Sequence, residues 1–308
     1  TQVQIKPAVR ASRPLKAPFP PGSFRPMRSA WSRCMHSRPS ANNDKGTEAM
    51  IEIAKYPLAG KKGLILGIAN EHSIAYGCAQ AFRALGADLA ITYLNEKAKP
   101  YSEPLAKELD AALFLPCDVS EDGQLEDVFA AVEKTWGRLD FALHSIAYAP
   151  KADLHGRVVD CSRDGFALAM DVSCHSFIRM AHLAEPLMKD GGTLFTMSYY
   201  GAEKVVEHYN IMGPVKSALE AVVRYIAVEL GPKEIRVHAI SPGPVRTRAA
   251  SGIDHFDALM EKAAARAPSH KLVGIEDVGM ATAYLATDYA KLITGETIYV
   301  DGGYHILA

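Results

Sequence analysis

The feature that most limits the possible folds of this chain is a repeated alternation of short apolar runs and longer periodic segments from Leu58 onward. Short apolar runs bounded by turn residues are typical of buried parallel strands, whereas apolar residues three and four apart indicate helices. Strands are expected at 62–67, 88–93, 113–116, 139–145, 193–197, 236–240 and 297–300. Helices are expected at 73–85, 125–136, 166–189, 209–230 and 276–286. This order predicts an α/β fold with a doubly wound parallel sheet flanked by helices, which binds ligands at the carboxyl ends of its strands.

The first 49 residues differ in composition from the rest of the chain. Between Thr1 and Asn43 there are eight Lys or Arg residues and no Asp or Glu. This composition resembles an organelle transit peptide, although seven prolines there would break an amphipathic helix. The other interpretation is a bacterial protein whose true start is Met50. In both cases we expect residues 1–49 to be disordered and residues 50–308 to form a single Rossmann-type domain.

The composition narrows the classes of function. Hydrophobic residues make up 48% and charged residues 22% of the chain, as in an ordinary globular enzyme. A formal net charge of -1 gives no electrostatic basis for binding nucleic acid or an anionic membrane. No apolar run approaches the roughly 20 residues that span a bilayer, so no integral membrane association is expected. The five cysteines form no CxxC pair and the histidines form no cluster, which predicts a reducing compartment and no metal site.

Two Tyr/Lys pairs compete for a catalytic role between Ser198 and Lys216. Tyr200 and Lys204 have the YxxxK spacing of ordinary short-chain dehydrogenases, whereas Tyr209 and Lys216 are seven residues apart. The run before Tyr199 is a buried strand, so Tyr200 comes too early to lie on the following helix. The helical pattern begins near Tyr209, and we expect Tyr209 and Lys216 to share one helix face. Position therefore favours the second pair.

The first strand-to-helix turn has the pattern Gly67-x5-Ser73-Ile74-Ala-x-Gly77. Small residues at such a turn let a pyrophosphate approach backbone N–H groups at a helix N-terminus. The pattern is not GxGxxG, but it still predicts a dinucleotide site at this turn.

Several further segments agree with a known family. They are Cys117-Asp118-Val119 after the third strand, His144-Ser145-Ile146-Ala147 after the fourth, the loop 241–247, and Val300-Asp301-Gly302-Gly303. With the Gly67 turn and the Tyr209/Lys216 pair, they resemble the bacterial NADH-dependent enoyl-acyl-carrier-protein reductases, divergent members of the short-chain dehydrogenase/reductase superfamily. The resemblance extends from about Leu58 to Leu307.

The resemblance implies a set of cofactor contacts. These are Gly67, Ser73, Ile74, Leu94, Asp118, Val119, Ser145, Ile146, Lys216, Val245, Arg246, Thr247, Arg248 and Ala249. Leu94 stands where the family often has a glutamine. Because a 2′-phosphate favours nearby Arg or Lys, Asn95-Glu96 after the second strand favours NADH over NADPH, while Lys97 argues the other way.

The resemblance also implies the chemistry. A hydride from the nicotinamide adds to the β-carbon of a trans-2-enoyl thioester and leaves negative charge on the thioester oxygen. Tyr209 would hydrogen-bond that oxygen, and Lys216 would hold the nicotinamide ribose and lower the pKa of the phenol. Tyr199 is implied as the second active-site tyrosine, and Ala149, Tyr199 and Phe256 are the expected substrate contacts.

The resemblance further implies an acyl-carrier protein as partner, a homotetramer, and a cytoplasmic location in a bacterium, or an organelle matrix if the extension is a transit peptide. The segment 249–270 carries apolar residues at helical spacing, which could form ordinary core, but its place directly after the loop 241–247 favours a lid over the acyl chain. Two other functions remain open: an ordinary carbonyl reductase that uses Tyr200 and Lys204, and a non-catalytic nucleotide-binding regulator.

Overall fold

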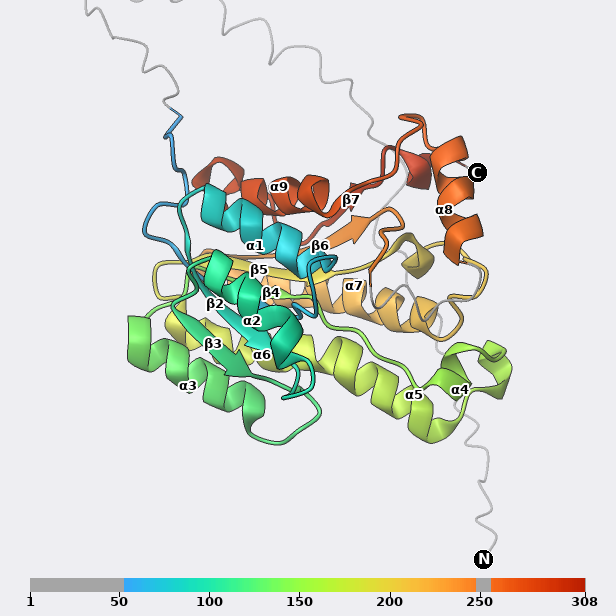
Figure 1. The fold of residues 1–308 in the computed structure, drawn as a ribbon, viewed down its shortest axis with the longest axis horizontal. Coiled ribbons are helices and arrows are strands. Elements are labelled where there is room, and N and C mark those ends of the chain that lie inside the picture. The colour runs from blue at the N-terminus through green and yellow to red at the C-terminus, as the bar shows by residue number, and fades with distance from the viewer. Residues whose placement is uncertain (1–52, 248–255, 308) are drawn as a thin grey trace, which may run out of the picture. The chain divides into compact units, whose positions relative to one another are not determined.

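The computed structural model of the chain describes residues 53–247 and 256–307. They form a seven-stranded parallel sheet in the order β3-β2-β1-β4-β5-β6-β7 (Figure 1). The strands are β1 (Lys62–Leu66), β2 (Asp88–Tyr93), β3 (Leu113–Pro116), β4 (Phe141–His144), β5 (Gly192–Met197), β6 (Ile235–Pro242) and β7 (Thr297–Val300). The chain winds outward from β1 to β3 and then returns to the middle at β4. Ligands bind where such a sheet reverses its order, which here is between β1 and β4.

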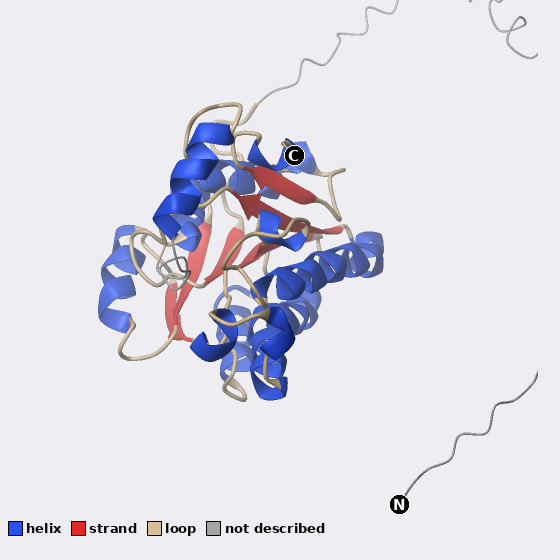
Figure 2. Cartoon of the chain, turned by 90° about the vertical axis from the view of Figure 1, so that its right-hand side faces the viewer, coloured by secondary structure: helices blue, strands red, loops and turns tan. Residues whose placement is uncertain are grey.

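Helices cover both faces of the sheet (Figure 2). The longer helices are α1 (Ile74–Ala84), α2 (Lys99–Glu108), α3 (Gln124–Trp136), α5 (Arg163–Met170), α6 (Ser176–Ala184), α7 (Met212–Leu230), α8 (Phe256–Arg266) and α9 (Ile275–Ala286). Successive strand residues point to opposite faces. Leu64 and Leu66 therefore pack with α3, α6 and α7, while Ile65 packs with α1 and α9. The predicted fold, a doubly wound parallel sheet, is confirmed.

Helices α1 and α9 touch through two glycines. A Cβ atom on Gly77 would collide with the carbonyl of Ile275, and one on Gly279 would collide with the carbonyl of Gly77. The two backbones can approach this closely only because neither position has a side chain. The contact sets the direction of α1, whose N-terminus faces the predicted pyrophosphate position.

The predicted helix at 166–189 is not one continuous α-helix. Its central segment, Asp171–His175, is a turn of π-helix between α5 and α6. Such turns insert one extra residue per turn and are frequent at functional sites. The single-helix prediction is therefore wrong in detail.

The prediction that Tyr209 lies on the same helix as Lys216 is also wrong, because α7 begins at Met212. A helix that included Asn210 would require a hydrogen bond from the N–H of residue 214 to the Asn210 carbonyl, and Pro214 has no N–H. In addition, His208 and Asn210 have left-handed backbones, with φ of 65° and 43°. Tyr209 thus lies in a turn that precedes α7.

Helices α2 and the short α4 (Lys151–Leu154) were not predicted, whereas α8 forms within the segment expected to carry helical spacing. No helix in residues 53–247 and 256–307 is long and apolar enough to cross a bilayer. The predicted extension 1–49 lies outside the described residues.

Candidate active site

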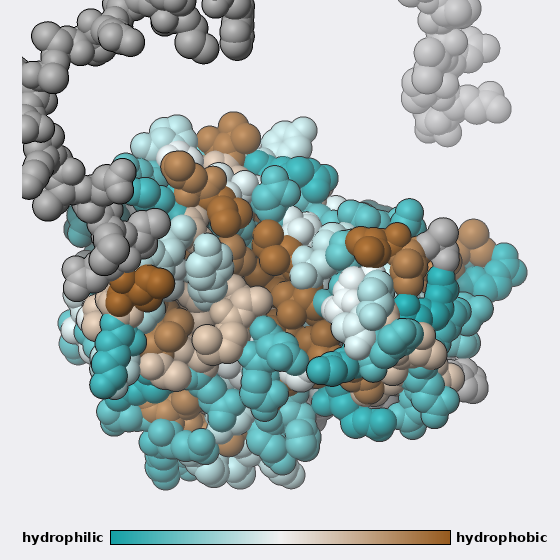
Figure 3. Space-filling model, turned by 90° about the horizontal axis from the view of Figure 1, so that it is seen from above, coloured by the Kyte–Doolittle hydropathy of each residue, from teal (hydrophilic) through white to brown (hydrophobic). Residues whose placement is uncertain are grey.

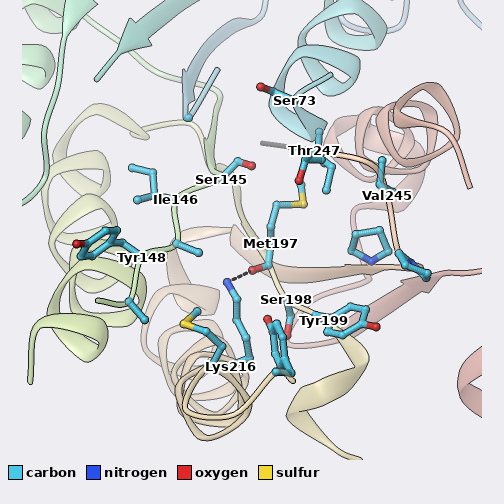
Figure 4. Close-up of a pocket in the computed structure, with 18 of the residues that line it drawn as sticks. Ser73, Ser145, Ile146, Tyr148, Met197, Ser198, Tyr199, Lys216, Val245 and Thr247 are labelled. Atoms are coloured by element: carbon cyan, nitrogen blue, oxygen red, sulfur yellow. Dashed lines mark hydrogen bonds between the residues drawn. The ribbon is translucent and has the colours of Figure 1, made fainter. Parts of the chain in front are cut away.

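A cleft with a volume of about 680 Å³ opens at the carboxyl ends of β1, β4, β5 and β6 (Figure 4). It brings together many of the residues predicted for cofactor, substrate and catalysis. Those that line it are Gly67, Ser73, Ile74, Ser145, Ile146, Ala149, Tyr199, Tyr209, Lys216, Val245, Thr247 and Phe256. These residues come from six separate stretches of sequence, so the fold itself assembles the site.

The turn after β1 is shaped to let a ligand approach the N-terminus of α1. Gly67 has a φ of 107°, and a Cβ atom there would collide with the backbone of Ser145. Ser73 occupies the N-cap position, and its Oγ accepts hydrogen bonds from Ala69 N–H at 3.0 Å and Asn70 N–H at 3.1 Å. The hydroxyl therefore shapes the turn as well as lining the cleft. Free N–H groups at a helix N-terminus suit a pyrophosphate.

The loop after β4 is held by the π-helical turn. Ser173 Oγ accepts a hydrogen bond from Tyr148 N–H at 2.9 Å and donates one to the Tyr148 carbonyl at 3.0 Å. His144, at the end of β4, lies between Ser176 Oγ at 2.7 Å and Thr196 Oγ at 3.1 Å. Burial lowers the pKa of His144 to about 3, so its ring is neutral at physiological pH. The sequence signal for these contacts was the two serines, Ser173 and Ser176, within the predicted helix 166–189.

Lys216 is buried and reaches from α7 to the end of β5. Its Nζ donates a hydrogen bond to the Met197 carbonyl at 2.7 Å, as Figure 4 shows. Burial lowers the pKa of Lys216 to about 8, while the neighbouring Cys174 and Glu220 act to raise it. An ammonium group retained in a buried cleft is a strong electrostatic element, because little water screens it.

Tyr199 and Tyr209 meet edge to face, with ring centroids 4.9 Å apart. Burial raises the pKa of both phenols, and their proximity adds to this effect for Tyr209. The pKa of Tyr209 is raised, chiefly by burial, so the expected lowering of this pKa by Lys216 is not seen in this structure. Both phenols stay protonated near neutral pH and can act as hydrogen-bond donors. The buried Tyr199 Oη has no hydrogen-bond partner within the described residues.

The competing pair, Tyr200 and Lys204, lies outside the cleft. Tyr200 begins a short 3-10 turn, and its ring packs against Tyr304 with centroids 5.5 Å apart. Lys204 is exposed, and its backbone N–H donates to the Tyr200 carbonyl at 3.2 Å. Neither side chain lines the cleft, so the geometry does not support a reductase that uses this pair.

Several predicted cofactor residues do not line this cleft. Leu94 is 51% exposed at the end of β2, and Val119 is buried in the core beneath α3 and α6. The carboxylate of Asp118 accepts hydrogen bonds from Ser120 N–H at 3.0 Å and Ser120 Oγ at 2.6 Å. The roles predicted for these three residues stay predictions.

One residue predicted to contact the cofactor in the loop after β6 does not line the cleft, and its role stays a prediction. Arg246 is exposed and forms an ion pair with Asp257 at 2.7 Å, at the start of α8. Its side chain is thus directed to α8, and it does not line the cleft. Arg248 and Ala249 lie outside the described residues.

Other residues that line the cleft were not predicted as contacts, although Ala147, Pro242, Gly243 and Pro244 lie in the motifs that carry the family resemblance. The lining residues outside those motifs are Ala69, Tyr148, Lys151, Leu154, His155, Met197, Ser198 and Met212. Most of them neighbour a predicted residue and could have been found by extending each motif by one or two positions. No group of His, Cys, Asp or Glu that could hold a metal ion occurs among residues 53–247 and 256–307.

A buried tyrosine and lysine beside a helix N-terminus suited to a pyrophosphate indicate a dinucleotide-dependent oxidoreductase of the short-chain dehydrogenase/reductase type. The family model described as enoyl-(acyl carrier protein) reductase matches residues 67–305. The chain therefore belongs to the enoyl-(acyl carrier protein) reductase family.

Its relatives agree over most of their length. Enoyl-[acyl-carrier-protein] reductase [NADH] 1 of Rhizobium meliloti is 48% identical over 246 residues, which are 80% of this chain and 90% of the relative. The corresponding Aquifex aeolicus enzyme is 47% identical over 251 residues, 81% of this chain and 93% of the relative. A solved structure of the Anaplasma phagocytophilum reductase in complex with NAD has a TM-score of 0.80 at 47% identity, and covers 83% of this chain and 97% of its own.

Proposed function

We propose that this protein reduces the trans-2,3 double bond of enoyl-acyl-carrier-protein thioesters with NADH, the last step of each cycle of fatty-acid elongation. Family membership supports the reaction class. The observation that carries the proposal for the site is the meeting of Tyr199, Tyr209 and Lys216 in one cleft.

The residues of the cleft fit NADH. The left-handed Gly67 lets the turn after β1 pack against the backbone of Ser145, and the hydroxyl of Ser73 bonds the same turn. The N-terminus of α1, which follows this turn, suits a pyrophosphate. Glu96, after β2, bonds Tyr93 Oη at 3.0 Å and lies 3.6 Å from Lys99 Nζ. A carboxylate after β2 disfavours a 2′-phosphate and supports NADH over NADPH, while the neighbouring Lys97 and Lys99 act the other way. When bound, NADH supplies the hydride that adds to the β-carbon of the substrate.

The remaining steps belong to residues of the chain. Tyr209, kept protonated by burial, donates a hydrogen bond to the thioester oxygen where negative charge develops. Lys216, already anchored to the Met197 carbonyl, has further N–H groups for the nicotinamide ribose. Tyr199, whose Oη is unpartnered, lines the acyl pocket beside the thioester with Ala149 and Phe256. Together these groups orient the substrate and stabilise the enolate. The enolate then takes up a proton at its α-carbon, from the Tyr209 hydroxyl or from a water at the nicotinamide ribose, which completes the reduction.

The test is the oxidation of NADH and, separately, of NADPH by the full chain, with crotonyl thioester and with a simple ketone. We expect reduction of the thioester with NADH and little reaction with the ketone, because the chain belongs to the enoyl-(acyl carrier protein) reductase family. Ketone reduction in place of thioester reduction would support a carbonyl reductase. The absence of turnover with every substrate would support a non-catalytic nucleotide-binding regulator.

We infer a homotetramer from two exposed apolar surfaces. One lies on α5, α6 and α7 and includes Phe166, Ile178, Tyr225 and Val228. The other lies at α9 and near β7 and includes Met280, Tyr284 and Leu292. Figure 3 shows that apolar side chains occur among polar ones on the face seen from above. Two separate self-complementary surfaces generate a closed assembly of four copies. Light scattering on the purified chain tests this, and a monomer at micromolar concentration would contradict it.

The proposed location is the cytoplasm of a bacterium, with an organelle matrix as the alternative if residues 1–49 act as a transit peptide. The proposed reductase domain is 50–308. Acyl-carrier protein is the proposed partner that delivers the thioester to the cleft. Fusing residues 1–49 to a fluorescent reporter in a eukaryotic cell distinguishes the two locations, because import into an organelle requires a functional transit peptide.

A further inference from the structure

Helix α7 holds the end of β5 at two successive residues. Lys216 Nζ donates to the Met197 carbonyl at 2.7 Å, and Ser198 Oγ donates to Glu220 Oε1 at 2.5 Å. Lys216 and Glu220 are four residues apart, one turn along the same helix face. The next residue of the chain is Tyr199. Any shift of these two hydrogen bonds therefore moves Tyr199, the tyrosine whose ring contacts Tyr209 in the cleft.

Glu220 is a buried carboxylate that the reaction described above does not use. Burial raises the pKa of Glu220, and the exposed Glu203 acts in the same direction. The Ser198 hydroxyl, Arg224 and Lys216 act in the opposite direction and favour the ionised form. Burying a carboxylate is unfavourable unless charged or hydrogen-bonding partners compensate. A glutamine would make the same hydrogen bond at less cost, so the charge itself calls for an explanation.

The groups around Lys216 indicate what that charge does. His144 on β4 is neutral, and burial raises the pKa of Cys174 in the π-helical turn, so its thiol is neutral as well. Cys174 and Glu220 both act to raise the pKa of Lys216, and Glu220 is the carboxylate of the two, one helical turn from Lys216 on α7. An opposite charge favours the protonated form of a buried amine.

We propose that Glu220 is a positioning residue for the reduction: through Ser198 it fixes the segment that carries Tyr199, and its charge, one helical turn away on α7, stabilises the ammonium group of Lys216 that is bonded to the Met197 carbonyl. The inference rests on the proposed function of the same cleft. Its two parts are separable, because one depends on a hydrogen bond and the other on a charge.

Three variants test the proposal: Glu220→Gln, Ser198→Ala and, as the matched control on the same helix, the exposed Glu229→Gln. The measurements are kcat and KM for crotonyl thioester between pH 6 and 10, the dissociation constant of NADH from its fluorescence at the same pH values, and the melting temperature. Removing the charge in Glu220→Gln should move the alkaline limb of kcat/KM, and of NADH binding, to lower pH by roughly one unit. Ser198→Ala should lower kcat by about tenfold and leave the alkaline limb in place, because it removes one hydrogen bond and no charge. Glu229→Gln should match the wild type.

The proposal would be overturned if the alkaline limbs of kcat/KM and of NADH binding lay at the same pH in Glu220→Gln as in the wild type. Should that variant fail to fold, Glu220→Asp replaces it: the charge is kept but Ser198 is out of reach, so kcat should fall while the limb stays, and a wild-type kcat would overturn the positioning role. If the wild type itself does not reduce the thioester, the proposed function fails. The pH dependence of NADH binding then still decides whether Glu220 controls Lys216.

Discussion

The two ends of the cleft are constructed differently. At the end near α1, the backbone forms the site: a left-handed Gly67 and the N-terminus of a helix. At the other end, side chains form it: Tyr199 after β5, Tyr209 in a turn and Lys216 on α7. A backbone site depends on a few adjacent residues, whereas a side-chain site depends on how separate elements pack. We therefore expect substitutions at the first end to act mainly on cofactor binding and those at the second mainly on the rate.

The largest expected effect is at the side-chain end. Lys216→Met should lower kcat/KM by about 100- to 1000-fold, because it removes the buried positive charge and leaves the Met197 carbonyl without its partner. Steady-state kinetics with NADH and crotonyl thioester measure this, and Lys204→Met is the control. A loss of less than threefold in Lys216→Met would show that this end does not depend on the lysine.

The second prediction concerns acid stability at the same end. The pKa of His144 is lowered to about 3 in the folded protein from an ordinary value of 6.5, so the unfolded chain binds more protons between these values. The contribution of His144 to the free energy of unfolding is therefore present above pH 6.5 and is lost as the pH falls toward 3. The loss from this group is about 2 kcal/mol at pH 5.

Urea unfolding at pH 7 and pH 5 measures the acid effect. The free energy of unfolding should differ less between pH 7 and pH 5 in His144→Gln than in the wild type, by about the 2 kcal/mol given above. In His182→Gln, whose residue is exposed on α6, the difference should be that of the wild type. An equal pH dependence in wild type and His144→Gln would contradict the prediction.

The third prediction addresses the backbone end. Gly67→Ala should weaken NADH binding by at least about tenfold, because a Cβ atom would collide with Ser145 at a left-handed φ that costs about 1–3 kcal/mol for other residues. Gly123→Ala is a matched control, since Gly123 has a φ of 84° but nothing within 4 Å of the added Cβ. It should lose stability and keep the wild-type dissociation constant for NADH. Equal NADH binding by both variants would refute the backbone role of Gly67.

The smallest expected effect is on the link between the Tyr209 turn and α4, whose last residue, Leu154, lines the cleft. Asn210 Nδ2 donates to the Leu154 carbonyl at 2.6 Å, and the left-handed φ of Asn210 is one that glycine also adopts. Asn210→Gly should therefore keep the turn and raise KM for the thioester by about two- to tenfold, the worth of one hydrogen bond. The dissociation constant for NADH should not change. A change in it would contradict the claim that cofactor binding depends mainly on the end of the cleft near α1.

Sequence reasoning was most successful where structure is local. The strands and the Gly67 turn follow from short apolar runs and small residues, and the fold they predict is the one observed. The surroundings of Tyr209 could not be predicted in full, because helical spacing continues through 209–211 while the missing N–H of Pro214 and the left-handed His208 and Asn210 end it. The proline was visible in the sequence and was the one available signal.

Other features depend on packing between distant segments. The π-helical turn that places Ser173 against Tyr148 and the bond between Ser198 and Glu220 join residues 22 or more positions apart. No periodicity encodes such pairings. The cofactor roles of Leu94, Asp118 and Val119 stay predictions, because their side chains do not line the cleft.

The central claim is that Tyr209, and not Tyr200, serves the reaction. The most direct measurement is kcat/KM for crotonyl thioester with NADH in Tyr209→Phe and Tyr200→Phe, each of which removes one hydroxyl and keeps the ring. We expect a loss of about 100-fold or more in Tyr209→Phe, whose hydroxyl donates to the thioester oxygen, and a near wild-type value in Tyr200→Phe, whose ring lies outside the cleft. The reverse pattern would contradict the account.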